Sequence, residues 1–341
     1  MFFGRSRELL EIAQFLRGDQ SVSLDGPLGI GKTSLLLHLT RPRTATELGL
    51  WNGSLVSYID CAALEEESSK GVFRHFASML IVEMESRNLP EEVELRKTIA
   101  SPSRLAFESA VRALNRRGLQ VVFLLDHFER LSVNSHLDLP FFNVLRSMAG
   151  RFRLAYLAAS ASPLIDLTYS GRSGEILSSP FFNIFAPLHL GLLPEEDARD
   201  LIQKPAQRTG CPFSTDMSNF LYRLAGGHPL ILQTACCHAV ECPDDRAGIE
   251  ERTIREIKPF IENIWRNLTA IEKQTLLRVA GTSFSNSVAG SDQAVLGRLE
   301  RQCLLLQENG RYVSPCKVWM DFLNRRSPSL GTAPSEEVHD R

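Results

Sequence analysis

The stretch of sequence that best indicates the fold of this chain is Gly26-Pro27-Leu28-Gly29-Ile30-Gly31-Lys32-Thr33. It matches the eight-residue pattern of a phosphate-binding loop, follows a short apolar run at 22–24, and leads into an amphipathic helix predicted from Ser34 to residue 39. Glycines let backbone N–H groups turn towards phosphate oxygens, and a helix N-terminus adds partial positive charge there. We therefore expect these residues, with Ser34, to bind ATP or ADP. Lys32 would reach the β- and γ-phosphates, and Thr33 would hold Mg²⁺.

Apolar runs in the first half of the chain alternate with segments of helical periodicity, which is typical of a parallel sheet. The run at 121–125 is apolar at every position, and such a strand needs burial on both faces. We therefore predict an α/β fold with helices on both faces of the sheet. The predicted strands are residues 22–24, 55–59, 121–125, 154–159 and 184–190.

The second half of the chain changes character after Gly191, where strand signals stop and helical ones begin. The helical pattern from Pro194 onward breaks at Gly226-Gly227-His228-Pro229 and then resumes. A third unit starts near Trp265, and its Asn309-Gly310 pair predicts a small hairpin because both residues tolerate positive φ. Its other predicted elements are a helix capped by Thr269, a helix at 293–301 and a last helix at 317–323.

Four segments follow from this pattern. We predict a sheet domain at 1–190, a helical domain at 191–260, a winged-helix domain at 261–326 and a flexible tail at 327–341.

Composition narrows the class of protein. At 341 residues the chain exceeds the usual size of one hydrophobic core, and its net charge of -2 disfavours a protein that coats nucleic acid or an anionic membrane. Its seven cysteines are odd in number and lack repeated CxxC spacing, which is typical of reduced thiols. No signal peptide precedes Arg5, and no apolar run reaches the roughly 20 residues that span a bilayer. We expect a cytoplasmic protein without a membrane partner.

A phosphate loop with bound Mg²⁺ needs an acidic residue at the end of a neighbouring strand. Asp126 follows the run 121–125 and is the candidate, although such a residue could instead cap a turn. Glu129 is the carboxylate within reach of an attacking water in this loop; the alternative is a surface ion pair with Arg130. We predict catalytic roles for Lys32, Asp126 and Glu129, with Thr33 and Asp126 as the metal ligands.

Together these residues resemble the STAND group of signalling ATPases within the AAA+ class, from Phe3 to about Arg325. The resemblance rests on four segments: Phe3-Gly4-Arg5-Ser6-Arg7-Glu8-Leu9, the phosphate loop, Asp126-His127-Phe128-Glu129, and Gly226-Gly227-His228-Pro229. It implies that Phe3, Gly4 and Arg5 lie against adenine, and that the domain at 191–260 is a lid whose Pro229, with His228, contacts the nucleotide. It also implies that Ser160 senses the γ-phosphate.

The resemblance further implies function. A STAND protein is a molecular switch whose ADP-bound state is closed and whose ATP-bound state forms oligomers or binds a partner, with slow Mg²⁺-dependent ATP hydrolysis. Because neither end of the chain has room for an effector or a sensor, we expect these to be separate proteins. The resemblance does not single out an arginine finger among Arg146, Arg151, Arg153 and Arg172.

Two alternatives stay open. The first is a DNA-associated AAA+ ATPase of the origin-recognition or transposition type, which would bind DNA through its winged helix. Its recognition segment at 291–303 has Asp292 and Glu300 against Arg298 and Arg301, so its net charge is zero and does not favour phosphate contacts. The second is a scaffold that binds nucleotide without hydrolysing it.

Overall fold

The computed structural model describes residues 2–169, 180–208, 210–281, 284–285 and 290–326. The chain divides into two compact units, the first ending at Gly191 and the second beginning at Leu192. The predicted flexible tail at 327–341 lies outside the described residues. None of the described helices combines the length and the apolar character that crossing a bilayer requires.

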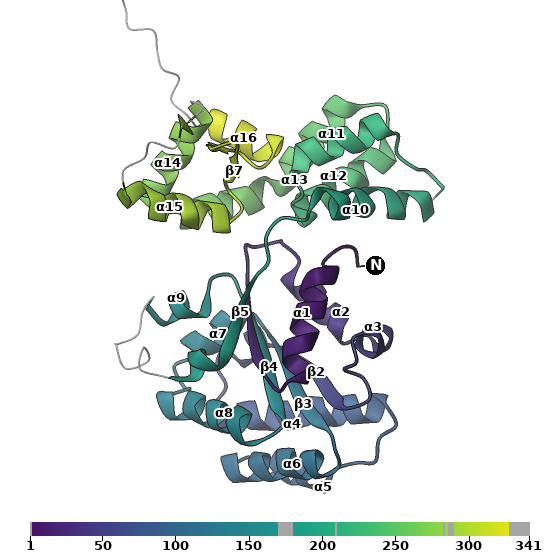
Figure 1. Cartoon of the computed structure of the whole chain (residues 1–341), viewed down its shortest axis with the longest axis vertical. Coiled ribbons are helices and arrows are strands. Elements are labelled where there is room, and N and C mark those ends of the chain that lie inside the picture. The colour runs from purple at the N-terminus through teal and green to yellow at the C-terminus, as the bar shows by residue number, and fades with distance from the viewer. Residues whose placement is uncertain (1, 170–179, 209, 282–283, 286–289, 327–341) are drawn as a thin grey trace, which may run out of the picture. The chain divides into compact units, whose positions relative to one another are not determined.

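The first unit is a five-stranded parallel sheet with helices on both faces (Figure 1). All five predicted strands are confirmed, each within one residue or so of its expected ends. They are β1 (Ser21–Asp25), β2 (Ser54–Asp60), β3 (Gln120–Asp126), β4 (Leu154–Ser160) and β5 (Phe185–His189), in the spatial order β2-β3-β4-β1-β5.

The helices of this unit follow the strands in the alternation that the sequence predicts. They are α1 (Ser6–Arg17), α2 (Lys32–Leu39), α3 (Pro42–Glu47), α4 (Ser69–Ser86), α5 (Val93–Ala100), α6 (Arg104–Arg116), α7 (Phe128–Val133), α8 (Leu139–Arg151) and α9 (Leu164–Tyr169), with 3-10 turns η1 (Cys61–Leu64) and η2 (Pro180–Ile184). Helix α2 begins two residues earlier than predicted, because Lys32 and Thr33 form its first turn.

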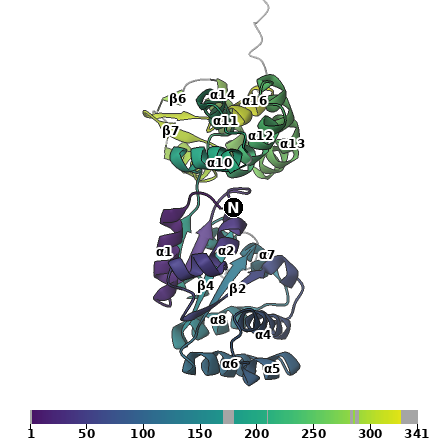
Figure 2. The same cartoon turned by 90° about the vertical axis from the view of Figure 1, so that its right-hand side faces the viewer.

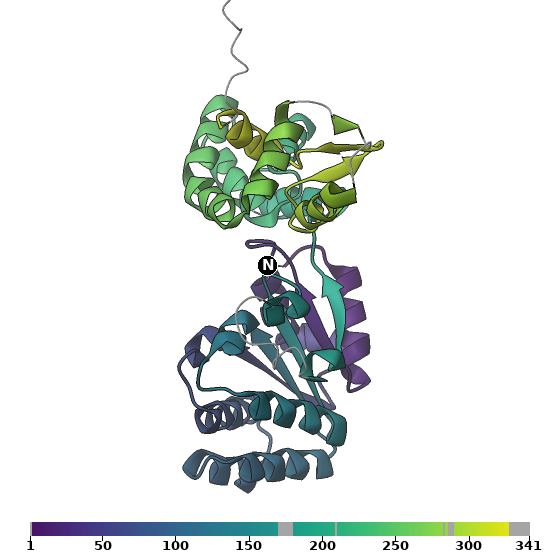
Figure 3. The same ribbon diagram turned by 90° about the vertical axis from the view of Figure 1, so that its left-hand side faces the viewer.

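The central strand β3 is buried along its whole length, as the prediction of a doubly covered sheet requires. Val121, Phe123 and Leu125 pack in the large apolar cluster with α4, α6 and α8. Val122 and Leu124 alternate with them and are also fully buried, so their side chains point to the opposite face of the sheet. Helices α1 and α2 lie on that side of the sheet (Figures 2 and 3). Burying both faces stabilises the sheet through the hydrophobic effect.

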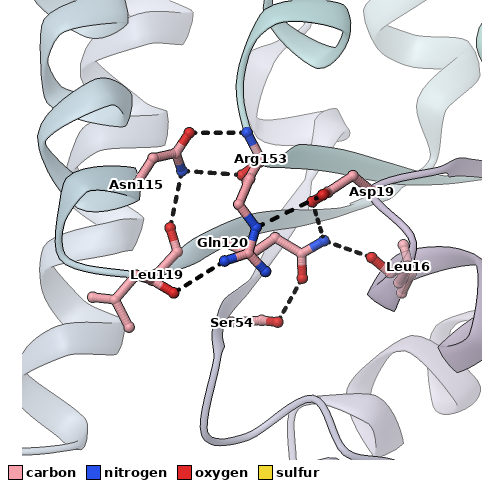
Figure 4. Close-up of polar contacts among 8 residues, drawn as sticks. Leu16, Asp19, Ser54, Asn115, Leu119, Gln120 and Arg153 are labelled. Atoms are coloured by element: carbon pink, nitrogen blue, oxygen red, sulfur yellow. Dashed lines mark hydrogen bonds and ion pairs between the residues drawn. The ribbon is translucent and has the colours of Figure 1, made fainter.

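A polar network joins the strands at their amino ends (Figure 4). Gln120 is 1% exposed; its Nε2 donates to the Leu16 carbonyl oxygen at 2.5 Å and to Asp19 Oδ1 at 2.8 Å, and its Oε1 accepts from Ser54 Oγ at 2.6 Å. Asn115 bonds both the amide and the carbonyl of Arg153 at 2.9 and 3.2 Å. At the amino ends of the strands these polar side chains hydrogen-bond to one another. The candidate site lies at the opposite edge of the sheet, at the carboxyl ends of the strands.

The second unit is mainly helical and carries a three-stranded antiparallel sheet of order β6-β8-β7. Its helices are α10 (Glu195–Arg208), α11 (Thr215–Ala225), α12 (Pro229–Glu241), α13 (Arg246–Asn267), α14 (Ala270–Gly281), α15 (Gly290–Arg301) and α16 (Lys317–Asn324), and its strands are β6 (Phe284–Ser285), β7 (Leu306–Glu308) and β8 (Arg311–Val313). The predicted helix start at Thr269 is confirmed, since Thr269 Oγ1 accepts from the Glu272 amide and Glu272 bonds the Thr269 amide in return.

The predicted hairpin is also confirmed. Asn309 and Gly310 have φ of 49° and 75° and connect β7 to β8. The order of α14, α15, the hairpin and α16 is the order that we predicted for a winged helix, and that assignment stays a prediction. Helix α13 runs across the expected domain boundary at residue 260, although Pro259 inside it lacks the N–H that a helix interior normally uses.

Candidate nucleotide-binding site

The phosphate-loop sequence connects β1 to α2 at the carboxyl edge of the sheet. Gly29 and Gly31 have φ of 72° and 102°, which side chains rarely adopt. A Cβ on Gly26 would lie 2.5 Å from the carbonyl oxygen of Leu190, so only glycine fits there. A Cβ on Gly31 would meet no atom within 4 Å, so the backbone at the start of α2 borders open space. The loop therefore has the curvature and the room that a phosphate group requires.

Lys32 lies folded over this loop. Its ammonium donates to the carbonyl oxygens of Gly26 and Pro27 at 2.6 and 3.0 Å. Burial lowers the pKa of Lys32, and the charges of three nearby carboxylates oppose that effect. These carboxylates belong to Glu129, Asp126 and Asp25. The fold thus brings together Lys32 and both acids that the sequence predicted for the site.

The ends of the five strands place a row of polar residues at this edge. Asp60 is in register with Asp126, and Asp25 is in register with both Ser160 and His189. Carboxyl ends of parallel strands meet at one edge, where ligands of open α/β sheets bind. In the order of the strands across the sheet, the row reads Asp60, Asp126, Ser160, Asp25 and His189.

Asp126 is 1% exposed and both of its carboxylate oxygens accept hydrogen bonds. Tyr58 donates its hydroxyl to Oδ2 at 3.0 Å, and the backbone amide of His127 donates to Oδ1 at 3.0 Å. Burial, followed by the charge of Asp126, raises the pKa of Tyr58, so its hydroxyl stays protonated and able to donate. The carboxylate is therefore held in a defined orientation.

His127 occupies the position directly after Asp126 and has φ of 50°. Its Nδ1 lies 3.0 Å from Asp60 Oδ1. Partial burial lowers the pKa of His127, but the hydrogen bond to Asp60 and the charge of Asp126 outweigh that effect and raise it above the ordinary value. The His127 side chain is thus bonded to Asp60 at the end of β2. The first acidic residue after Asp126 in the sequence is Glu129, which remains the candidate for catalysis.

Glu129 stands in the first turn of α7 with a buried Oε2 that has no hydrogen-bond partner in the described part of the chain. Arg130 lies 3.3 Å from Glu65 instead, so the alternative of a Glu129–Arg130 surface pair is not what the structure has. The negative charge of Glu129 raises the pKa of Lys32 and so opposes the effect of burial. A buried carboxylate oxygen without a donor fits a site that takes up a water molecule or another polar ligand.

Ser160 ends β4 and is 1% exposed. Its hydroxyl donates to the carbonyl oxygen of Ser162 at 2.6 Å. The hydroxyl can accept a further bond but would have to leave Ser162 to donate to a phosphate. The predicted contact with the γ-phosphate stays a prediction.

The N-terminal motif is joined to the phosphate loop through Arg5. Arg5 is 4% exposed, has φ of 64°, and donates to the carbonyl oxygens of Gly191 at 2.5 Å and Ile30 at 3.5 Å. Phe3 and Gly4 are half-buried beside it. Arg5 therefore connects the loop to the last residue of the first unit; the predicted adenine contacts of the motif stay predictions.

His228 and Pro229 lie in the second unit, at the start of α12. Proline suits this first helical position, where its missing N–H has no partner to lose. The two preceding glycines are tightly packed, because a Cβ on Gly226 would lie 1.8 Å from the Pro315 carbonyl oxygen and one on Gly227 would lie 2.6 Å from that of Leu193. A nucleotide contact by His228 and Pro229 stays a prediction.

Sequence reasoning missed Asp25, Tyr58, Asp60 and His189. His189 Nδ1 lies 2.7 Å from Asp25 Oδ2, directly before the phosphate loop. Three of the four are the last residues of strands, so polar residues that end apolar runs were the signal that could have identified them. Tyr58 had no such signal, because an aromatic residue inside a strand is common.

Two of the four arginines considered as fingers have internal partners. Arg151 lies 3.4 Å from Glu108, and Arg153 lies 3.7 Å from Asp19 in the amino-edge network (Figure 4). Arg153 is therefore at the edge of the sheet opposite the phosphate loop. Arg146 is exposed on α8, and Arg172 lies outside the described residues.

The residues present fit a nucleotide with a divalent cation. The loop borders open space at Gly31, the Lys32 ammonium lies on the loop, and Glu129 Oε2 is buried without a hydrogen-bond donor among the described residues. Thr33 in the first turn of α2 and the Asp126 carboxylate have oxygen atoms of the kind that Mg²⁺ prefers, and their role as metal ligands stays a prediction.

Known proteins resemble this chain in sequence pattern and in fold. The family model described as Novel STAND NTPase 2 matches residues 89–283, a region that begins after the phosphate loop and includes Asp126, Glu129, Ser160 and Pro229. No curated protein matches the chain.

Solved structures show the same fold at low sequence identity. The Walker-type ATPase paby2304 of Pyrococcus abyssi is similar with a TM-score of 0.68 and 15% identity, over 95% of this chain and 96% of that one. The ORC2 protein of Aeropyrum pernix, in ADPNP–ADP complexes, is similar with a TM-score of 0.58 and 12% identity, over 95% of each chain.

Proposed function

The chain belongs to the Novel STAND NTPase 2 family and is therefore a STAND-type P-loop NTP hydrolase of the AAA+ class; on this premise we propose that it works as a molecular switch set by ATP and ADP. In the proposed cycle, ADP holds a closed state and ATP favours a state that forms oligomers or binds a partner. Slow Mg²⁺-dependent hydrolysis sets the lifetime of the active form.

The observation that carries the proposal is that the phosphate loop is bonded to the segment through which the chain leaves the first unit. The amide of Leu190 donates to the Asp25 carbonyl oxygen at 2.8 Å, and Arg5 bonds Gly191. Gly26 packs against the Leu190 carbonyl so closely that no side chain fits between them. A rearrangement of the loop on nucleotide exchange would therefore act directly on residues 190 and 191.

We assign roles at the site as follows. Lys32 and the loop amides bind the phosphates, Thr33 and Asp126 hold Mg²⁺, and Glu129 orients the attacking water and accepts its proton. When bound, Mg²⁺ neutralises the charge that develops on the phosphate oxygens. Phe3, Gly4, Arg5, His228 and Pro229 contact the base, and Ser160 contacts the γ-phosphate.

Glu129→Gln tests hydrolysis and separates an enzyme from a scaffold that only binds nucleotide. The amide keeps the size of the side chain but cannot accept the proton, so we expect the rate of phosphate release to fall about 100-fold or more while the Kd for ATP changes little. Glu66→Gln, an exposed glutamate after η1, is the matched control and should keep wild-type activity. Equal rates in wild type and Glu129→Gln would contradict the assigned role.

The DNA-binding alternative has less support. On α15, Arg298 Nε lies 3.7 Å from Glu272 Oε1, so part of the positive charge of the candidate recognition helix is offset. A DNA affinity that falls steeply with salt and is lost in Arg298→Ala and Arg301→Ala would favour this alternative over the switch. We propose instead that the partner is a separately encoded effector or sensor protein.

A further inference from the structure

We propose that Tyr58 is a positioning residue for nucleotide hydrolysis, whose hydroxyl orients the Asp126 carboxylate towards the Mg²⁺ site. This inference rests on the proposed function, because it takes Asp126 as a metal ligand. Tyr58 belongs to none of the sequence motifs of the phosphate site.

The placement of Tyr58 follows from the register of β2 and β3. Asp60 pairs with Asp126 and Tyr58 pairs with Leu124, so residues 58 and 60 of β2 share one face with residues 124 and 126 of β3. From there the Tyr58 hydroxyl reaches Asp126 Oδ2 at 3.0 Å. The second oxygen, Oδ1, is held by the His127 amide at the same distance. Two donors on two different oxygens define the plane of the carboxylate.

The pair of hydrogen bonds leaves room for a metal. Each carboxylate oxygen has two lone pairs, and each here accepts one hydrogen bond from the described residues. One lone pair on each oxygen therefore stays open to Mg²⁺ or to a water molecule bound to it. Orienting partners of this kind commonly tune metal affinity as much as the ligands do.

The choice of a phenol also fits the charge of the site. Tyr58 is neutral, so it orients Asp126 without neutralising it, whereas a lysine or arginine would compete with Mg²⁺ for the carboxylate. Lys32, close by, already interacts with three carboxylates. A neutral donor preserves the negative charge for the metal.

Tyr156 offers the matched contrast within the same sheet. It lies on β4, is fully buried, and donates its hydroxyl to the Leu145 carbonyl oxygen at 3.1 Å in the apolar core. Its hydrogen bond serves packing between β4 and α8. Tyr58 differs because its partner is a carboxylate of the candidate site.

Tyr58→Phe removes the hydroxyl and keeps the ring, so the packing of β2 is preserved. We expect kcat to fall about 10-fold and the gain in ADP affinity on adding Mg²⁺ to shrink about 10-fold, while ADP affinity in EDTA is unchanged. Tyr156→Phe should lower thermal stability slightly and leave both Mg²⁺-dependent quantities as in wild type. The measurements are ATP hydrolysis against Mg²⁺ concentration and ADP titrations with and without EDTA.

The outcomes separate the two proposals. If wild type shows no Mg²⁺-dependent hydrolysis and no nucleotide binding, the proposed function fails. If wild type is active and Tyr58→Phe matches it in kcat and in Mg²⁺ dependence, only the role of Tyr58 is overturned. Equal losses in Tyr58→Phe and Tyr156→Phe, together with equal drops in melting temperature, would show a structural role and also overturn it.

Discussion

Lys32 shows how the fold changes the chemistry of a single residue. A lysine in water is a strongly hydrated cation, whereas here burial lowers its pKa and the ammonium is bound by two carbonyl oxygens of the loop. Charges from Glu129, Asp126 and Asp25 favour the protonated form. Partial burial of the ammonium in this loop strengthens its attraction to a phosphate group, because charges interact more strongly where the local dielectric constant is low.

Lys32→Ala should abolish nucleotide binding. The change removes the one ammonium of the loop and leaves the charges of Glu129, Asp126 and Asp25 without the cation that offsets them, so we expect the Kd for ATP and ADP to rise about 100-fold or more. Lys70→Ala, an exposed lysine on α4, is the control and should bind as wild type does. Titration with a fluorescent ADP analogue measures both. Normal binding by Lys32→Ala would show that the site is wrongly assigned.

At the scale of elements, two short turns need backbone conformations that glycine adopts more readily than other residues. The phosphate loop needs positive φ at Gly29 and Gly31, and the turn between α11 and α12 needs it at Gly226 and Gly227. The second turn also brings α11 against the segment before α16, because Gly226 faces the Pro315 carbonyl oxygen. Within the second unit, this turn therefore packs α11 against the segment that connects the β7–β8 hairpin to α16.

Gly226→Ala should destabilise the second unit. A side chain at position 226 is disfavoured by the φ of 58° and because its Cβ would lie 1.8 Å from the Pro315 carbonyl oxygen. We expect the free energy of unfolding to fall by about 2–5 kcal/mol. Gly297→Ala on α15 is the matched control: a Cβ there meets no atom within 4 Å, and alanine favours a helix by about 0.5–1 kcal/mol. Denaturant unfolding with hydrogen exchange measures both variants, and equal stability would contradict the packing argument.

At the scale of the whole molecule, the chain consists of two compact units joined at Gly191 and Leu192. The junction follows β5 directly, and β5 pairs with the strand that carries the phosphate loop. His189 and Asp25 add a side-chain bond of 2.7 Å between these two strands. The loop and the junction therefore belong to one bonded group of residues, as the proposed switch requires.

The switch predicts that nucleotide changes the shape or the mass of the protein. We expect sedimentation and light scattering to give one state with ADP and a different shape or a larger assembly with a non-hydrolysable ATP analogue, because the two nucleotides bind the states with different affinity. Lys32→Ala should give the same result in every condition. One unchanged shape and mass for wild type with either nucleotide, with candidate partners present, would exclude the switch.

Local sequence determined much of this protein by itself. The phosphate loop, the five strands, the helix cap at Thr269 and the Asn309-Gly310 hairpin were all predicted, because each depends on backbone preferences and burial within a few neighbouring residues. Asp126 and Glu129 followed from their distance to one buried strand. The predicted domain boundary at residue 260 falls inside α13. Local sequence does not show that this helix of 22 residues continues past Pro259.

Only the tertiary structure decided which side chains meet at the site. Tyr58 and Asp126 are 68 residues apart, His189 and Asp25 are 164 apart, and Arg5 and Gly191 are 186 apart. Strand order and register bring the first two pairs together, and a shift of one residue in register would turn each strand side chain to the opposite face. No local pattern encodes that register, since it is set by the packing of the whole sheet against its helices.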